Sequence, residues 1–219
     1  MTKRVLLSWS SGKDSAWALH VLRQDPTVEV RALLTTFNEA ADRVAMHAVR
    51  RSLVLRQAEA ARLPLWNVDI PSPCPNDVYE TRIMQAIERA QQEGFTHVAF
   101  GDLFLEDIRT YREARLAGTG LEPLFPLWGR PTAALAGEML SAGLGAYVTC
   151  VDPRKIGRDL AGRAYDAAFL AALPAAADPC GERGEFHTFC HSGPMFTTPI
   201  AVTPGTVVEH DGFVFADLR

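Results

Sequence analysis

Short β-type runs alternate with longer helical patterns along the first part of the chain, and the alternation occurs five times. The β-type runs cover residues 4–9, 28–37, 65–70, 97–100 and 123–128. The helical patterns between them cover residues 14–24, 45–63, 76–93 and 106–116. This order predicts an α/β fold with a mostly parallel sheet, right-handed crossovers and helices on both faces. Ligands bind such sheets beyond the carboxyl ends of the strands, so motifs at those ends are candidates for a functional site.

The pattern changes after Pro131, where alanine-rich helical stretches replace the regular alternation. A final part rich in Gly, Pro, Thr and Val follows, and Asp211-Gly212 predicts a hairpin turn within it. The helices expected here end at residue 142 and span 165–173, and the expected strands span 146–151, 207–210 and 213–216. We therefore predict two domains, residues 1–130 and a smaller α+β domain of residues 131–219.

The composition limits the class of protein. With 219 residues and 47% hydrophobic side chains, the chain can bury a core of its own. A net charge of -4 and a pI near 5.9 give no overall basic field, so nucleic acid is not an expected partner. The apolar run after the basic start stops at Ser8, too short for a signal peptide or a membrane span. We expect a cytoplasmic protein with no membrane partner.

The four cysteines lie far apart and include no C-x-x-C pair. This spacing predicts buried thiols rather than a zinc site or a disulfide framework. Cys180 lies in a motif described below, and a redox or nucleophilic role there is the alternative.

A run of small and charged residues connects the first expected strand to the first expected helix. It consists of Ser10, Ser11, Gly12, Lys13, Asp14 and Ser15. The unpaired N–H groups and positive dipole end of a helix N-terminus favour phosphate oxygens, and Lys13 adds a positive charge. Leu7 stands where a Walker A loop has its first glycine, and Asp14 follows the lysine, so this is a different phosphate loop. The alternative is that Ser10 or Ser11 only caps the helix.

The loop resembles the signature S-G-G-x-D-S of the PP-loop ATP pyrophosphatases, with Ser11 in place of the first glycine. The resemblance implies a Rossmann-like sheet, binding of the β- and γ-phosphates of ATP by residues 10–15, and cleavage of ATP at its α-phosphorus. We expect Lys13 and Asp14 to act in catalysis, with Mg²⁺ held at Asp14. The adenine is expected against the backbone of Leu34, Thr35, Thr36 and Phe37.

A second motif follows the fourth expected strand, at the edge of the sheet where a ligand would lie. Gly101 and Asp102 begin it, and both are expected to contact the nucleotide. Arg109 and Glu113 follow four residues apart on the next expected helix, and Arg109 could bind a substrate carboxylate bidentately. The alternative is that Arg109 and Glu113 only form an ion pair on the helix surface.

A third motif, residues 180–189, places two acids, one histidine and two glycines in what is expected to be a single loop. Carboxylates and an imidazole could orient an amine, accept its proton or hold magnesium. The alternative is a solvated turn with Phe186 and Phe189 in the core.

Together the three motifs resemble the diphthine–ammonia ligase family, which carries C-G-E-x-G-E-[FY]-E-T-F in its second half. The resemblance covers most of the chain and implies that a substrate carboxylate is adenylated by ATP and then aminated by ammonia. It places the following residues on the amine or substrate side: Glu182, Glu185 and His187 as catalytic groups, and His47, Arg109, Glu113, Gly184 and Thr188 as substrate-binding groups. Met46-His47, residues 57–60, residues 124–128 and Gly162-Arg163 also match landmarks of that family.

The third motif departs from the family at two positions. His187 stands where the diphthamide enzymes have glutamate, and Arg183 replaces a glycine. Exchanging a carboxylate for an imidazole changes the charge and the proton chemistry of the site. The acceptor is therefore expected to be a small-molecule or protein-side-chain carboxylate that need not be diphthine, and branches of this family have been linked to other amidations, including corrinoid salvage.

Two other functions and one assembly remain open from the sequence. Related PP-loop enzymes modify tRNA, which the acidic pI and the missing C-x-x-C argue against. A sensor that binds adenine nucleotide without catalysis would bind tightly and release no pyrophosphate. Apolar residues near the carboxyl terminus would also suit a homodimer.

Overall fold

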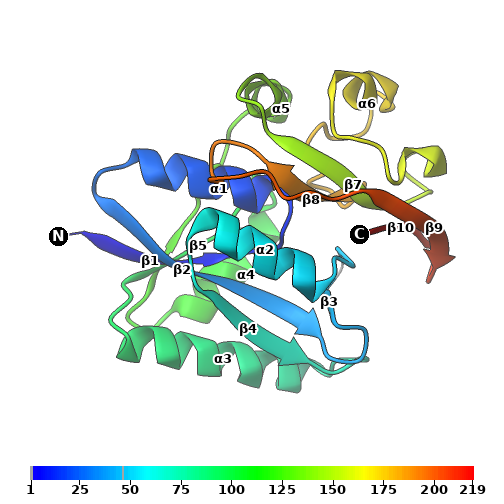
Figure 1. Ribbon diagram of the computed structural model, residues 1–219. Helices are drawn as coiled ribbons and strands as arrows, with labels where there is room; N and C mark the ends of the chain where they lie inside the picture. Colours follow the sequence, from blue (N-terminus) through cyan, green and yellow to red (C-terminus); the bar gives the residue numbers. More distant parts are fainter. Residues whose placement is uncertain (1, 46) are drawn as a thin grey trace.

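The computed structural model describes residues 2–45 and 47–219, and this part of the chain forms two β-sheets (Figure 1). The larger sheet has six strands in the order β3-β2-β1-β5-β6, with β4 also paired to β2. All of its pairings are parallel except that between β2 and β3. Its strands are β1 (Lys3–Ser8), β2 (Val28–Asn38), β3 (Arg43–Val44), β4 (Leu65–Ile70), β5 (His97–Ala99) and β6 (Glu122–Leu124).

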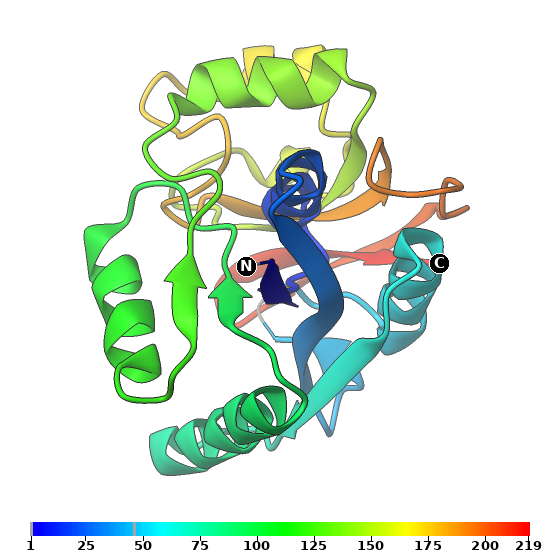
Figure 2. The ribbon, with the colours of Figure 1, turned by 90° about the vertical axis from the view of Figure 1, so that its left-hand side faces the viewer.

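Helices cover both faces of this sheet (Figures 1 and 2). They are α1 (Lys13–Gln24), α2 (Arg51–Ala61), α3 (Asn76–Gln92) and α4 (Glu106–Leu116). In β1, Leu7 belongs to the apolar cluster that contains Leu19 of α1. Its neighbour Leu6 belongs to a different cluster, with Ile87 of α3. Successive residues of a strand point to opposite faces, so the continuous apolar run of β1 reflects a sheet that is buried on both sides.

The smaller sheet is antiparallel, with the strand order β8-β7-β10-β9. Its strands are β7 (Gly145–Val151), β8 (Phe186–Ser192), β9 (Pro204–His210) and β10 (Phe213–Leu218). The helices beside it are α5 (Thr132–Ser141), η1 (Arg158–Leu160) and α6 (Ala167–Ala172). Helix α1 contacts β2 of the larger sheet and β8 of the smaller one, so it lies between the two (Figure 2). The predicted α/β fold with a smaller second unit is confirmed, and the boundary at residues 130 and 131 stays a prediction.

No helix in residues 2–45 or 47–219 combines the length and the apolar character needed to cross a membrane.

The helix expected over residues 45–63 begins only at Arg51, the first residue of α2. Before it, the Val44 amide donates to the Val49 carbonyl at 2.8 Å. Ala48 adopts a left-handed backbone with φ 54°, which an α-helix cannot contain. The prediction is therefore wrong at residue 45 and at residues 47–50, and Met46 lies outside the described residues.

The segment expected to be one loop over residues 180–189 becomes a strand at Phe186. Thr188 pairs with Val148 of β7, and Phe189 is fully buried in the core. The prediction of a loop therefore holds only as far as residue 185. Beyond it, His187 and Thr188 line the functional site described below, whereas Phe189 and Cys190 are buried in the core.

Candidate active site

A cavity of about 600 Å³ lies at the carboxyl ends of β1, β2 and β5. The start of α1, the turn before α2, helices α3 and α4, and the segment that leads into β8 complete its wall. The neighbours of β1 in the sheet are β2 on one side and β5 on the other. This is the point at which the strand order reverses, where open α/β sheets bind their ligands.

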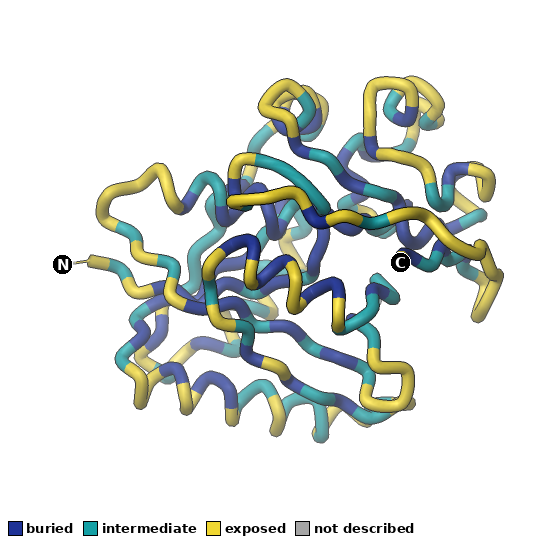
Figure 3. The backbone as a smooth tube through the Cα atoms, viewed as in Figure 1, coloured by how far each residue is buried: buried dark blue, intermediate teal, exposed yellow. Residues whose placement is uncertain are grey.

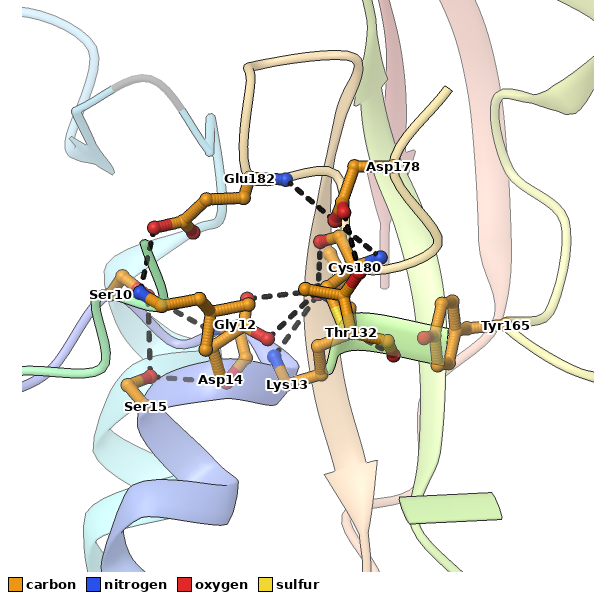
Figure 4. A network of polar contacts seen from close by, with 12 residues as sticks. Ser10, Gly12, Lys13, Asp14, Ser15, Thr132, Tyr165, Asp178, Cys180 and Glu182 are labelled. Carbon is orange, nitrogen blue, oxygen red and sulfur yellow. Dashed lines mark hydrogen bonds and ion pairs between the residues drawn. The ribbon is translucent and has the colours of Figure 1, made fainter. Parts of the chain in front are cut away.

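The small-residue loop begins after β1 ends at Ser8, and α1 begins at Lys13. Gly12 is the N-cap residue, and no side chain caps the helix through its own hydroxyl or carboxylate at that position. Instead, the Lys13 amide donates to Thr188 Oγ1 of β8 at 3.1 Å. Ser10 Oγ and Ser15 Oγ lie 3.2 Å apart at the wall of the cavity (Figure 4). The alternative in which Ser10 or Ser11 only caps the helix is therefore not what this loop does.

Ser11 adopts a left-handed backbone with φ 68°, a conformation that glycine takes at little cost. This explains why the PP-loop signature has glycine at this position, and a serine there costs about 1 kcal/mol. The Ser11 carbonyl accepts hydrogen bonds from the Cys190 amide and Gln57 Nε2, both at 2.9 Å. Its side chain is fully buried and does not line the cavity, so it is not placed as a further phosphate donor.

Gly12 has no room for a side chain. A Cβ atom there would lie 3.0 Å from His47 Cε1 and 3.2 Å from the Thr188 carbonyl oxygen. Gly101, after β5, is equally confined, because its Cβ would lie 3.1 Å from the Ser15 amide nitrogen. Both glycines thus allow the loop at the start of α1 to pack directly against the neighbouring segments.

Lys13 is almost completely buried at the centre of the site, with 2% of its side chain exposed. Its Nζ donates to both carboxylate oxygens of Asp14, at 3.0 and 2.8 Å, and to the Cys180 carbonyl (Figure 4). Burial acts to lower the pKa of Lys13, but the adjacent Asp14 carboxylate outweighs it and the pKa is raised. The side chain is therefore a fixed ammonium ion, held between the amino-terminal loop and the segment before β8.

Three carboxylates line the cavity: Asp14, Asp102 and Glu182. Glu182 Oε1 accepts a hydrogen bond from the Leu103 amide at 2.7 Å. Burial, assisted by the charges of Asp14 and Asp102, raises the pKa of Glu182 to about 7. A carboxyl group with this pKa exchanges a proton near neutral pH, which suits a general acid or base.

The carboxylates also bear on magnesium. Within residues 2–45 and 47–219, no three His, Cys, Asp or Glu side chains are grouped as a complete metal site. Mg²⁺ at nucleotide sites is bound through one or two carboxylates together with phosphate oxygens and water, so a complete protein cage is not needed. Asp102 Oδ2 is buried and makes no hydrogen bond in the described part of the chain, although Arg112 Nε lies 3.5 Å away as an ion-pair partner, and Asp102 lines the cavity together with Asp14. These two side chains fit a magnesium ion that phosphates also bind.

Asp178 shapes the segment that carries Glu182. Its Oδ1 accepts from the amides of Cys180 at 2.8 Å and Glu182 at 3.3 Å, and its Oδ2 accepts from the Thr132 hydroxyl at 2.7 Å (Figure 4). The Asp178 amide donates to Glu185 Oε1 at 3.0 Å. Glu185 is buried in this network and does not line the cavity. Glu182 faces the cavity, whereas Glu185 holds the shape of the loop.

Two imidazoles close the other side of the site. The rings of His47 and His187 lie 4.6 Å apart, and His47 Nδ1 donates to the Thr188 carbonyl at 3.1 Å. Burial lowers the pKa of His47 to about 4 and that of His187 to about 3. Both rings are therefore neutral near pH 7 and leave the positive charge of this region to Lys13.

Several residues expected at the site lie outside the cavity wall. Arg109 pairs with Glu113 at 2.7 Å on the outer side of α4 and stacks on Trp128 with its guanidinium 4.8 Å from the ring centre. Gly184 also lies outside, next to Lys155. The positions of Arg109 and Glu113 support the alternative in which they form an ion pair on the surface of the helix.

Residues 34–37 of β2, where the adenine is expected, point their side chains alternately to the two faces of the sheet. Leu34 and Thr36 of β2 line the cavity. The Thr35 hydroxyl donates to the Trp9 carbonyl at 2.7 Å on the opposite face. Phe37 is fully buried on that face, beneath the guanidinium of Arg51. Only every second residue of this strand can present its side chain to a nucleotide.

Three further residues contribute to the site although no role was expected for them from the sequence; one of them, Gln57, lies in the matched family landmark of residues 57–60. Arg112, on α4, lines the cavity with its Nε 3.5 Å from Asp102 Oδ2. Gln57 is fully buried and bonds Trp9 Nε1, the Ser11 carbonyl and the Cys190 carbonyl, so it fixes the phosphate loop. Asp178 is the third. The signal available for Gln57 is a polar residue on the apolar face of α2, and Arg112 and Asp178 carry no comparable signal.

The cysteines are unpaired, as the spacing predicts, and Cys150, Cys180 and Cys190 are buried. Burial raises the pKa of the Cys180 thiol to about 12, so the group is not a thiolate near neutral pH. The site uses the carbonyl oxygen of Cys180 rather than its sulfur.

A mostly parallel sheet whose first strand leads through a serine- and glycine-containing loop into a helix, with a buried lysine at the start of that helix, is typical of α/β proteins of the PP-loop class. Residues 3–121 match the family model described as diphthamide synthase N-terminal domain, so the chain belongs to that family. It is also 29% identical, over 237 residues, to diphthine–ammonia ligase of Danio rerio, in an alignment that covers 97% of this chain and 91% of the relative. The family indicated by the three sequence motifs is confirmed.

Proposed function

We propose that the protein is an ATP-dependent ligase that joins a substrate carboxylate to AMP and then replaces AMP with ammonia, giving an amide. The observation that carries the proposal is that one cavity contains both the loop at the start of α1 and Glu182 of the third motif. The loop can bind the pyrophosphate that leaves, and Glu182 can accept a proton from the attacking amine. The name of the Danio rerio relative supports the same class of reaction.

In the proposed complex, the pyrophosphate part of ATP lies against residues 10–15 and Lys13. The adenine lies against the backbone of residues 34–37, with the side chain of Thr36 facing it. Asp14 and Asp102 hold the magnesium ion, which supplies positive charge to the phosphates when bound. Gly101 allows this arrangement because it lets the loop and the end of β5 approach each other closely.

In the first half-reaction, a carboxylate oxygen of the substrate bonds to the α-phosphorus of ATP, and the bond from that phosphorus to the bridging oxygen of the β-phosphate breaks. Pyrophosphate leaves with the electron pair of the broken bond. The amides at the start of α1 and the Lys13 ammonium stabilise the charge that develops on it. These groups are fixed by hydrogen bonds before the substrate binds, so they need little reorganisation.

In the second half-reaction, the nitrogen of ammonia bonds to the acyl carbon, the bond from that carbon to the phosphate oxygen breaks, and AMP leaves. The nitrogen loses a proton, which we assign to ionised Glu182. His47, His187 and Thr188 form the neighbouring wall on the substrate side. The imidazoles of His47 and His187 are neutral, so this wall presents no carboxylate that would repel an anionic acceptor.

The residue at position 187 bears on the identity of the acceptor substrate. Diphthine–ammonia ligases have glutamate where this chain has His187, so we propose that the carboxylate substrate differs from diphthine. A neutral imidazole at this position tolerates a second anionic group on the substrate better than a carboxylate does. Diphthine-modified protein is therefore the acceptor expected to fail, and small polycarboxylic metabolites, corrinoid acids among them, are the class expected to react.

The proposal is tested with purified protein, ATP, Mg²⁺, ammonium and pools of carboxylate metabolites, in parallel with diphthine-modified protein. The expected result is release of AMP and pyrophosphate in at least one pool, measured by mass spectrometry. Release of ADP instead, or tight ATP binding with no product in any pool, would show that the protein is a different kind of ATPase or a nucleotide sensor.

A further inference from the structure

Two arginines close the base of the turn that carries His47. Arg43 and Arg50 form an antiparallel bridge to each other, on either side of the turn. The Val44 amide donates to the Val49 carbonyl at 2.8 Å just inside this bridge. These two contacts close the turn at its base, and Met46 within it lies outside the described residues.

Both guanidinium groups converge on Asp217, a residue of β10 in the smaller sheet. Arg43 Nη2 lies 2.9 Å from Asp217 Oδ1, and Arg50 bonds both carboxylate oxygens, at 3.0 and 2.5 Å. The Asp217 side chain is only 16% exposed. Hydrogen bonds from Arg50 and Arg43 hold the pKa of Asp217 well below its usual range, so the group is ionised throughout the neutral range.

The Asp217 carboxylate is surrounded by arginine side chains. Arg219 also lies near it, with its Nε 3.6 Å from Asp217 Oδ2. The other acids near the turn, Asp42 and Asp69, pair with Arg51 instead. Without Asp217, the like charges of Arg43 and Arg50 would face each other at the base of the turn with no anion between them.

At its other end, the turn touches the phosphate loop. The His47 ring lies tilted against that of His187 and donates to the Thr188 carbonyl, and its Cε1 would lie 3.0 Å from a Cβ atom at Gly12. A continuous chain of contacts therefore runs from β10 through Arg43 and Arg50 to the start of α1.

We propose that Asp217 is a positioning residue that holds His47 against the phosphate loop and so couples the smaller sheet to the nucleotide site. The structural part of this proposal is independent of the reaction, whereas its effect on turnover rests on the ligase function proposed above. The two parts can be tested separately.

The structural test is an NMR titration of the His47 imidazole in ligand-free protein, with the six histidine signals assigned by single substitutions. In the unmodified protein His47 is partly buried and its pKa is about 4. In Asp217→Asn the turn is released, and we expect the pKa of His47 to rise by one unit or more toward the solvent value of about 6.5. Glu209→Gln is the matched control, because Glu209 on neighbouring β9 forms an exposed ion pair with Arg158.

An unchanged His47 titration in folded Asp217→Asn would overturn the proposal. If that variant does not fold, Arg50→Gln takes its place, because it removes both Arg50 bonds to Asp217 yet keeps the bond between Arg43 and Asp217. The same shift is expected in this variant, and an unchanged titration is again decisive. Asp217→Glu keeps the charge and should restore at least part of the low pKa.

The functional test is a double-mutant cycle on pyrophosphate release. Asp217→Asn and His47→Ala should each lower turnover, and the double variant should be no slower than His47→Ala alone, because Asp217 acts through His47. Additive losses would contradict action through His47. If the unmodified protein releases no pyrophosphate, the ligase function fails, whereas the NMR titration still decides the role of Asp217.

Discussion

The two segments that meet at Lys13 are built in different ways. Residues 10–15 form one continuous turn between β1 and α1, and Gln57, Thr188 and Cys190 bond the backbone of this turn. The segment before β8 is instead organised around a side chain of its own, Asp178, and is tied to Thr132 of α5 and to the Leu103 amide. As a result, its two glutamates have different surroundings, although only Arg183 and Gly184 separate them.

This difference separates residues that act in the cavity from residues that shape it. Glu182 faces the cavity and has a pKa of about 7, whereas Glu185 is bound to the Asp178 amide in the interior. Arg112 and Arg109 of α4 differ in the same way, because the first lines the cavity and the second lies on the helix surface. The following predictions test these distinctions, beginning with the largest expected effect.

Lys13→Ala should lower pyrophosphate release about 100-fold or more, because it removes the fixed cation of the phosphate loop. It also leaves Asp14 without its ion-pair partner in a buried position, so thermal unfolding should be measured in parallel. Lys155→Ala is the control, since Lys155 is partly exposed, donates to the Arg183 carbonyl and forms a 3.8 Å ion pair with Asp152. A Lys13→Ala protein that is folded and retains most of its turnover would remove the basis for the loop assignment.

Glu182→Gln should lower turnover about 10- to 100-fold with little loss of ATP affinity, because it removes the proton acceptor. Glu185→Ala should instead reduce the free energy of unfolding by about 1–3 kcal/mol, because it leaves the buried Asp178 amide without its partner. Steady-state kinetics and urea unfolding of both variants provide the comparison. If both folded variants lose turnover equally, the assignment of proton transfer to Glu182 and of loop stability to Glu185 is wrong.

The pH dependence of stability isolates the Glu182 carboxyl group. Its pKa is raised from 4.5 to about 7 in the folded protein, so the folded state binds more protons than the unfolded state between these values. The unfolding free energy should therefore fall as pH rises from 4.5 to 7, by roughly 2–3 kcal/mol at 1.36 kcal/mol per pKa unit. Glu182→Gln should lose this contribution and become the more stable protein at pH 8 but not at pH 5, as measured by urea unfolding at both pH values. Parallel pH profiles for the two proteins would contradict the raised pKa.

The smallest effect is expected on α4. Arg109→Ala should change turnover less than threefold and reduce stability by about 1 kcal/mol or less, since it removes one exposed ion pair and one stacking contact. Arg112→Ala should lower turnover about tenfold, because Arg112 faces Asp102 at the cavity wall. A larger loss of turnover in Arg109→Ala than in Arg112→Ala would instead support Arg109 as the residue that binds the substrate carboxylate.

The sequence predicts the alternation of strands and helices and the place of the phosphate loop, because both depend on local periodicity and on a contiguous run of residues. It does not separate Glu182 from Glu185, since both flank the same short turn and only the bonds of Asp178 distinguish them. The helix expected over residues 45–63 is wrong at its start for a similar reason. Arg43 and Arg50, which bridge each other before α2, pair with Asp217, which lies far away in the chain.

The central claim is that a carboxylate attacks the α-phosphorus of ATP, and oxygen labelling tests it most directly. The reacting acceptor would be prepared with ¹⁸O in its carboxylate and incubated with protein, ATP, Mg²⁺ and ammonium, and the AMP product analysed by mass spectrometry. The account predicts AMP that carries one ¹⁸O atom taken from the acceptor, together with the amide. AMP that contains no label, or ADP as the product, would contradict it.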